Sequence, residues 1–288
     1  MIHQFEIHQK DFLYCEEIIK KASKTFYAAF SQLPEQQAWS IYAVYAFCRE
    51  ADDLIDEAHD IEGLYRLEAE LKDFEANKVP DRPLWRALSV VFLNYDMDIQ
   101  AFYDMLAGQK QDADFKQPQT QAELSQYAYN VAGSVGLMLL PILSDNWREI
   151  IPQGKKLGEA LQITNILRDI GEDYENGRIY LPAAVMKRYG LTEEMLAAKI
   201  IGAELISVWE DQAAIAEKLY VDSLKMMPNI NPEARSALLA ASYYYREILV
   251  VVRNSHYQVF SEKPKVSHLR KLSLLAKIHQ EVTEIVEY

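Results

Sequence analysis

Residues 39–56 of the chain read WSIYAVYAFCREADDLID. The first eleven of these residues are apolar on almost every side of a helix, which is typical of a helix buried at the centre of a bundle. Asp52 and Asp56 follow four residues apart and therefore share one face of that helix. Towards the N-terminus this face continues through Arg49, Cys48, Tyr45 and Ile41. We therefore expect the two carboxylates at the mouth of an apolar interior.

A second acidic pattern lies in NILRDIGED, residues 165–173. Asn165, Asp169 and Asp173 stack on one helical face, although like charges at this spacing destabilise a helix by about 0.2–0.5 kcal/mol per pair. Taken alone, either acidic pattern also fits a solvent-exposed polar face. Two such helices that face each other would instead supply the oxygen ligands that Mg²⁺ prefers.

Cations accompany both acidic patterns, since Arg49 and Arg168 lie within one helical turn of the carboxylates. A guanidinium binds a diphosphate through paired hydrogen bonds. A site of Mg²⁺ and Arg beside an apolar pocket suits the ionisation of an allylic diphosphate. The cations stabilise the departing diphosphate, and the pocket keeps water away from the carbocation.

The composition favours an all-α protein with one domain over residues 1–288. Half of the 288 residues are apolar, and Gly and Pro number only 10 each, which disfavours a turn-rich β architecture. No linker or repeat divides the chain. The apolar periodicity predicts helices over residues 11–30, 35–57, 61–76, 82–94, 98–108, 121–143, 147–175, 182–188, 193–199, 202–226, 231–259 and 266–287.

The net charge of −13 argues against a nucleic-acid partner, which would require a basic face. The N-terminal segment MIHQFEIHQKDF does not resemble a signal peptide. The most apolar stretch, Val131–Leu143, is shorter than the ~20 residues that span a bilayer. We therefore expect a cytoplasmic protein in which Cys15 and Cys48 are buried thiols.

Small residues form a stripe along the predicted 121–143 helix, at Ala128, Ala132 and Gly136. Such a stripe has two interpretations. It lets a neighbouring helix approach closely, or it leaves room for a ligand.

Several stretches together resemble the squalene/phytoene synthase family, and within it the bacterial enzymes that form dehydrosqualene. They are SKTFYAAF (23–30), IYAVYAFCREADDLID (41–56), YAYNVAGSVG (127–136), LGEALQITNILRDIGEDYENGRIYLP (157–182) and YYYREIL (243–249). A DxxxD motif alone is unspecific, whereas the NILRDxxED-to-YLP block placed after DDLID is specific. The resemblance implies an all-α isoprenoid synthase fold around a central cavity.

The resemblance also implies the roles of individual residues. Two or three Mg²⁺ ions would be bound by Asp52, Asp56, Asn165, Asp169 and Asp173. Diphosphate and prenyl contacts would come from Ala22, Ser23, Lys24, Thr25, Tyr45, Arg49, Gln162, Arg168, Tyr245 and Lys265. Tyr127 would lie on the cavity wall. The catalytic residues would be Arg49, Tyr127 and the four aspartates. The small-residue stripe would line the prenyl tunnel instead of forming a tight helix contact.

Two positions depart from the family pattern. Ala22 stands where relatives often have His, so the contact of that His is lost. Lys265 stands where relatives have Arg, so the diphosphate contact is weakened.

The implied reaction joins two farnesyl diphosphates head to head, through presqualene diphosphate, to give dehydrosqualene (4,4'-diapophytoene) for carotenoid synthesis. Phytoene synthesis from two geranylgeranyl diphosphates, squalene synthesis and a non-catalytic assembly role are the alternatives. Loss of a proton completes the leading reaction, so NADPH is not expected; the absence of a dinucleotide motif decides nothing, because relatives that use NADPH lack one too. Since the product is a water-insoluble hydrocarbon, peripheral contact with a membrane stays open, but we identify no basic amphipathic helix for it.

Overall fold

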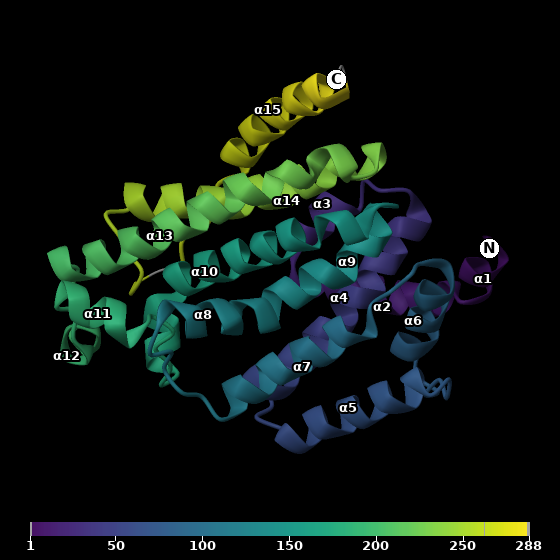
Figure 1. Ribbon diagram of the computed structural model, residues 1–288, viewed down its shortest axis with the longest axis horizontal. Helices are drawn as coiled ribbons and strands as arrows, with labels where there is room; N and C mark the ends of the chain where they lie inside the picture. Colours follow the sequence, from purple (N-terminus) through teal and green to yellow (C-terminus); the bar gives the residue numbers. More distant parts are fainter. Residues whose placement is uncertain (1, 262, 287–288) are drawn as a thin grey trace.

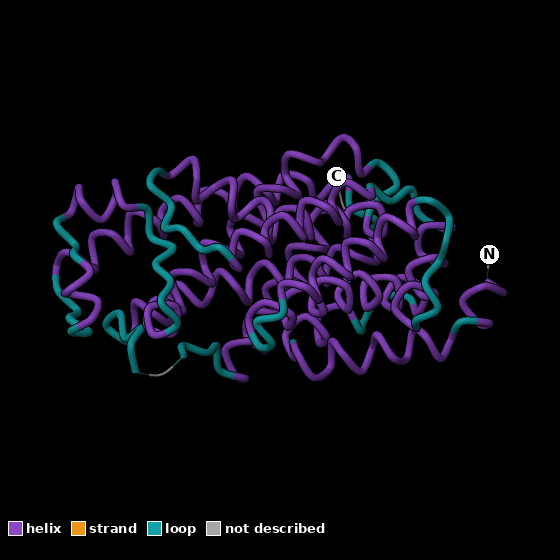
Figure 2. The backbone as a smooth tube through the Cα atoms, turned by 90° about the horizontal axis from the view of Figure 1, so that it is seen from below, coloured by secondary structure: helices purple, strands orange, loops and turns teal. Residues whose placement is uncertain are grey.

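The computed structural model describes residues 2–261 and 263–286. Within these residues the chain forms helices joined by loops and has no β-strand (Figure 2), so the predicted all-α class is confirmed. The helices are α1 (Ile2–Ile7), α2 (Gln9–Ala22), α3 (Lys24–Phe30), α4 (Glu35–Asp56), α5 (Ile61–Glu75), α6 (Pro83–Asn94), α7 (Ile99–Ala113), α8 (Gln121–Ala128), α9 (Ser134–Leu143), α10 (Ile151–Glu175), α11 (Ala183–Tyr189), α12 (Glu193–Ala197), α13 (Ala203–Ser223), α14 (Pro232–Asn254) and α15 (His268–Val286). Three short segments complete them: a π-helical turn, η1 (Tyr129–Gly133), and two 3₁₀ turns, η2 (Trp147–Ile150) and η3 (Leu224–Asn229).

Helix α4 lies at the centre of the bundle, as its sequence predicts. Every residue from Ala38 to Val44 is buried, because α4 packs against α2, α5, α6, α7 and α9 on its different sides. The long helix α10 packs against α9, α13 and α14. Figure 1 shows α10, α13 and α14 running side by side, with α4, α5 and α7 in the other half of the molecule. The two acid-bearing helices, α4 and α10, thus belong to different layers of one bundle.

The predicted helix over 11–30 is two helices, and α1 before it was not predicted. Helix α2 ends at Ala22, and Ser23 has an extended backbone with φ −142° and ψ 90°. The Ser23 hydroxyl accepts a hydrogen bond from the Phe26 amide at 3.3 Å and so caps α3. A serine cap satisfies an amide that a helix start leaves free, which explains why a new helix begins here.

The predicted end of a helix at residue 108 is wrong, because α7 continues to Ala113. Gly108 suggested a loop, but it lies inside the helix at a close crossing. A Cβ there would lie 2.6 Å from Cγ1 of Val131 in the π-helical turn. The additional turn of α7 carries Gln109 and Asp112, which both prove to line the cavity described below.

The predicted 121–143 helix is divided by the π-helical turn η1 into α8 and α9. Its small residues serve the contact with α10: a Cβ at Gly136 would lie 2.8 Å from the Gly154 carbonyl oxygen, and one at Gly158 only 2.3 Å from that of Ala132. Ala132 and Gly136 also line the cavity, whereas Ala128 does not. The expectation that the stripe excludes a tight helix contact is therefore wrong.

The remaining differences concern helix ends. A 3₁₀ turn precedes α10, α13 ends at Ser223 before η3, and α14 ends at Asn254, five residues earlier than predicted. The predicted end of the last helix at 287 lies outside the described residues. Among the described residues, none of the helices has both the length and the apolar character needed to cross a bilayer.

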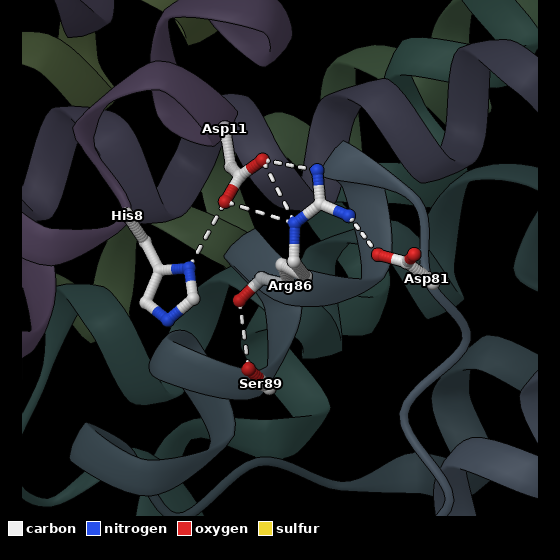
Figure 3. Close-up of polar contacts among 5 residues, drawn as sticks. All are labelled: His8, Asp11, Asp81, Arg86 and Ser89. Carbon is white, nitrogen blue, oxygen red and sulfur yellow. Dashed lines mark hydrogen bonds and ion pairs between the residues drawn. The ribbon is translucent and has the colours of Figure 1, made fainter.

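A partly buried ion pair joins α2 to α6 near the N-terminus (Figure 3). Arg86 donates to Oδ1 of Asp11 at 2.8 Å, and Nδ1 of His8 lies 2.9 Å from its Oδ2. Burial alone would raise the pKa of Asp11, but the hydrogen bonds from Arg86 and His8 hold it below its usual value. A charge this buried needs such partners, so the cluster fastens the two helices together.

Candidate active site

A cavity of about 830 Å³ lies within the bundle. Its wall is apolar where α3, α4, α9, α10 and α14 contribute side chains such as Phe30, Val44, Leu139, Leu161 and Ile248. Acidic, basic and amide side chains from α4, α7, α10 and the segment before α15 also line it. The cavity therefore combines polar and apolar lining, as the face of the 39–56 helix predicts.

All five predicted metal ligands line this one cavity: Asp52 and Asp56 from α4, and Asn165, Asp169 and Asp173 from α10. Burial, and then the nearby Asp56, raise the pKa of Asp52 to about 7. Burial and then Asp169 raise the pKa of Asp173 to about 8. These raised pKa values mean that ionising both acids in the folded chain costs free energy. A bound cation would remove that cost.

Cationic and amide side chains contact the acids. Arg178 Nη1 donates to Asp56 Oδ1 at 2.7 Å, and Gln109 Nε2 donates to Asp52 Oδ1 at 2.5 Å. Asp169 accepts from Arg168 Nε at 2.7 Å, and its other oxygen lies 3.3 Å from Lys263 Nζ.

The donor types fit a hard divalent cation. In the described part of the chain no group of three acidic, His or Cys side chains is placed to hold a metal ion, and Asp56 and Asp169 are instead paired with arginines. The buried Oδ1 of Asn165, however, has no hydrogen-bond partner among the described residues. A buried amide oxygen beside carboxylates of raised pKa matches the all-oxygen ligand sets of Mg²⁺.

Every predicted substrate-binding residue also lines the cavity. The junction of α2 and α3 contributes Ala22, Ser23, Lys24 and Thr25; α4 contributes Tyr45 and Arg49; the remaining members are Gln162, Arg168, Tyr245 and Lys265. Arg49 pairs with Asp53 and lies 2.6 Å from Glu57 Oε1. These residues place several cations around a cavity in a chain whose net charge is −13.

Three further cations line the cavity and were not predicted: Arg178, Lys263 and Lys271. Lys271 comes from α15, and its Nζ donates to Thr25 Oγ1 at 3.1 Å. Burial lowers its pKa. Sequence reasoning could have found Arg178, because it lies inside the NILRD-to-YLP block. No local sequence pattern indicates the two lysines.

Tyr127 also lines the cavity, where it belongs to a buried network that was not predicted. Its hydroxyl donates to Asp112 Oδ2 at 2.9 Å, and the Tyr180 hydroxyl donates to Oδ1 at 2.7 Å. The two rings stack with centroids 5.0 Å apart. Burial raises the pKa of Asp112 to about 6 in spite of these hydrogen bonds. Asp112 thus holds two cavity-lining phenols in one orientation.

Acidic side chains from two helices, several cations and apolar side chains around one cavity of a helical bundle are the features of a prenyltransferase with the isoprenoid synthase fold. Residues 19–270 match the family model described as squalene/phytoene synthase. The chain belongs to the squalene/phytoene synthase family.

The relatives agree along nearly the whole chain. A 4,4'-diapophytoene synthase of Staphylococcus haemolyticus (strain JCSC1435) is 36% identical over 272 residues, covering 91% of this chain and 94% of that protein. A phytoene synthase of Arthrospira platensis is 33% identical over 282 residues, covering 91% and 90%. The crystal structure of a dehydrosqualene synthase in complex with ligand superimposes with a TM-score of 0.95 at 54% identity, covering 98% of this chain and 99% of that one.

Proposed function

We propose that this chain joins two farnesyl diphosphate molecules head to head, through presqualene diphosphate, to form dehydrosqualene (4,4'-diapophytoene) for carotenoid synthesis. The observation that carries the proposal is that the acidic residues of both helices line one cavity whose wall is otherwise largely apolar. The likeness to a diapophytoene synthase and to a dehydrosqualene synthase supports this substrate. A cavity near the top of the usual ligand-site range of about 300–1,000 Å³ suits two long prenyl chains.

In this proposal Asp52, Asp56, Asn165, Asp169 and Asp173 hold two or three Mg²⁺ ions. When bound, these ions stabilise the negative charge of the diphosphate that departs from the allylic carbon. The cations Lys24, Arg49, Arg168 and Lys265 bind the diphosphates, with Ser23, Thr25 and Gln162 as polar contacts. Ala22 lies beside them without a polar group of its own.

The apolar wall protects the reacting carbon from water. Tyr45, Tyr127 and Tyr245 line the cavity, and the faces of aromatic rings stabilise positive charge. The second substrate's double bond attacks the allylic cation, and loss of a proton closes the cyclopropane ring. The cyclopropyl intermediate then loses its diphosphate, rearranges and loses a second proton. This sequence needs no hydride, so we do not expect NADPH.

Phytoene synthesis from geranylgeranyl diphosphate is the second candidate, supported by the relatives named phytoene synthase. A non-catalytic assembly role is disfavoured, since every carboxylate of the site is present. We also propose that residues 1–288 act as one domain, because residues from Ile19 to Lys271 line the same cavity. A cytoplasmic location with peripheral membrane contact completes the proposal.

The experiment is an incubation of the purified protein and Mg²⁺ with each diphosphate in turn, followed by product mass. Farnesyl diphosphate should give a C30 hydrocarbon without added NADPH. A C40 product only would replace the proposal with phytoene synthesis, and a C30 product that requires NADPH would replace it with squalene synthesis.

A further inference from the structure

Gln109 is a buried glutamine near the end of α7. It is 3% exposed and lines the cavity, and its helix packs against α4 (Figure 1). Glutamine is mostly found at protein surfaces, because burying an amide costs free energy unless its polar atoms form hydrogen bonds. A glutamine at this position therefore needs a reason other than packing.

One end of this amide has a hydrogen-bond partner and the other end has none. Its Nε2 donates to Oδ1 of Asp52 at 2.5 Å. Its Oε1 is buried, and within residues 2–261 and 263–286 no group donates a hydrogen bond to it. Because an ionised carboxylate only accepts hydrogen bonds, the amide nitrogen must face Asp52 and the oxygen is turned away. The contact with Asp52 thus sets the orientation of the amide, although it leaves the oxygen without a partner.

The part of α7 that carries Gln109 is fixed on both sides. The preceding Gly108 lies at the close crossing with Val131, where a Cβ would lie 2.6 Å from that side chain. Three residues after Gln109, the Asp112 carboxylate accepts hydrogen bonds from two buried phenols. A side chain on a helix that is held in this way presents its donor at one defined place.

Gln109 differs in charge from the partners of the other acids. Arginines pair with Asp56 and with Asp169. An arginine neutralises a carboxylate and so competes with an incoming cation, whereas a neutral amide orients the carboxylate and leaves its negative charge in place. Arg49, which lies one turn before Asp52 on the same helix, pairs with two other acids. Asp52 is therefore oriented by a donor that does not compete with a cation.

We propose that Gln109 is a positioning residue for the metal site. Its Nε2 holds one oxygen of Asp52 and leaves the other oxygen, with the charge of the carboxylate, to a divalent cation. The inference rests on the proposed function in one respect, because it takes Asp52 as a metal ligand. Carboxylates that bind metals are themselves hydrogen-bonded, and loss of such a partner typically weakens metal binding about ten- to hundredfold.

The test is a titration of the metal-free protein with Mg²⁺ at a fixed concentration of inorganic diphosphate, followed by the unfolding temperature. Gln109→Met keeps an unbranched side chain of similar length and removes the donor. We expect this variant to need about ten- to hundredfold more Mg²⁺ than the wild type for the same rise in unfolding temperature. In EDTA the variant should unfold close to the wild type, because removal of the unpartnered oxygen offsets the lost hydrogen bond.

The matched control is Gln111→Met. Gln111 is an exposed glutamine of α7 that does not line the cavity, so this variant should have the Mg²⁺ requirement of the wild type.

Three outcomes would overturn the proposal. They are a wild-type protein whose unfolding temperature does not respond to Mg²⁺, a Gln109→Met protein with the wild-type Mg²⁺ requirement, and an equal loss in Gln111→Met. If Gln109→Met keeps the wild-type requirement but unfolds at a lower temperature in EDTA, Gln109 is a structural link between α7 and α4.

Product mass keeps a failure here distinct from a failure of the proposed function. A wild-type protein that responds to Mg²⁺ but yields no C30 hydrocarbon would remove the proposed function and leave the role of Gln109 in place. A wild-type protein that forms the C30 hydrocarbon, beside a Gln109→Met variant with an unchanged Mg²⁺ requirement, would remove only the role of Gln109.

Discussion

Arg178 and Asp56, 122 residues apart in the sequence, form a hydrogen-bonded ion pair at 2.7 Å on the rim of the cavity. The pair joins the segment after α10 to the end of α4. A second nitrogen of the same guanidinium reaches the Asp112 carbonyl oxygen at 3.5 Å. Arg178 therefore connects three of the chain segments that build the site.

Replacing Arg178 with Ala should lower kcat/KM about tenfold to hundredfold, the effect of losing a hydrogen bond to a charged group worth about 1.5–3 kcal/mol. Arg178→Lys should recover part of the lost kcat/KM, because lysine keeps the positive charge but lacks the paired N–H donors of the guanidinium. Steady-state kinetics with farnesyl diphosphate measures both. Arg188→Ala is the control, since that arginine forms a 3.5 Å surface pair with Asp211 and does not line the cavity. Equal kinetics for Arg178→Ala and wild type would contradict a role for the pair.

Replacing Asp52 with Asn should abolish turnover and leave the helix content unchanged. Asp52 is one of the proposed metal ligands, and burial and Asp56 disfavour its charge in the absence of metal. At pH 8, in EDTA, the variant should thus unfold at the same or a higher temperature than wild type. Mg²⁺ with inorganic diphosphate should raise the unfolding temperature of wild type only. An active Asp52→Asn protein would refute the ligand assignment.

Replacing Asp112 with Asn should reduce kcat more than it changes KM, on the order of tenfold, because Asn cannot accept both phenol hydrogen bonds and each is worth about 1 kcal/mol. Misplaced Tyr127 and Tyr180 rings should also change the ratio of cyclopropyl intermediate to final product. Product analysis by mass measures that ratio, which simple loss of folded protein would leave constant. Asp114→Asn, at an exposed acid two residues away, is the control.

Replacing Gly158 with Ala should destabilise the protein by about 1–3 kcal/mol. Helix propensity alone would favour Ala by about 1 kcal/mol, but the new Cβ would lie 2.3 Å from the Ala132 carbonyl oxygen, which is rigid backbone. Gly154→Ala is the matched control one turn earlier, where the Cβ would meet the mobile end of the Leu140 side chain at 2.6 Å. Urea unfolding compares the two, and a Gly154 variant as unstable as the Gly158 variant would contradict the explanation.

Both cysteines should resist thiol reagents in the folded protein. Burial raises the pKa of Cys15 to about 12 and also raises that of Cys48, so at pH 8 almost no thiolate is present to react. Absorbance with a disulfide reagent should reveal both thiols only after denaturant is added. Rapid labelling at pH 8 without denaturant would show that these side chains are accessible.

Much of the candidate site could be predicted because its signals are local. Asp52 and Asp56, like Asn165, Asp169 and Asp173, share faces through helical spacing alone, and the apolar run before Asp52 indicates which way that face points. The helix 98–108 shows where such reasoning fails. Gly108 has the local properties of a helix end, and only the crossing with Val131 explains a glycine inside the helix. The shortened helix concealed Gln109 and Asp112.

The sequence by itself determined the helical class, the central position of α4, the two acidic faces and the resemblance to the family, because these depend on periodicity and on residue order. Only the tertiary structure decided which side chains meet. Arg178 with Asp56, Tyr127 with Asp112, and Gly136 with Gly154 are pairs from different helices or loops. Such contacts depend on how helices cross, and crossing is set by the packing of whole surfaces and not by any one stretch of residues.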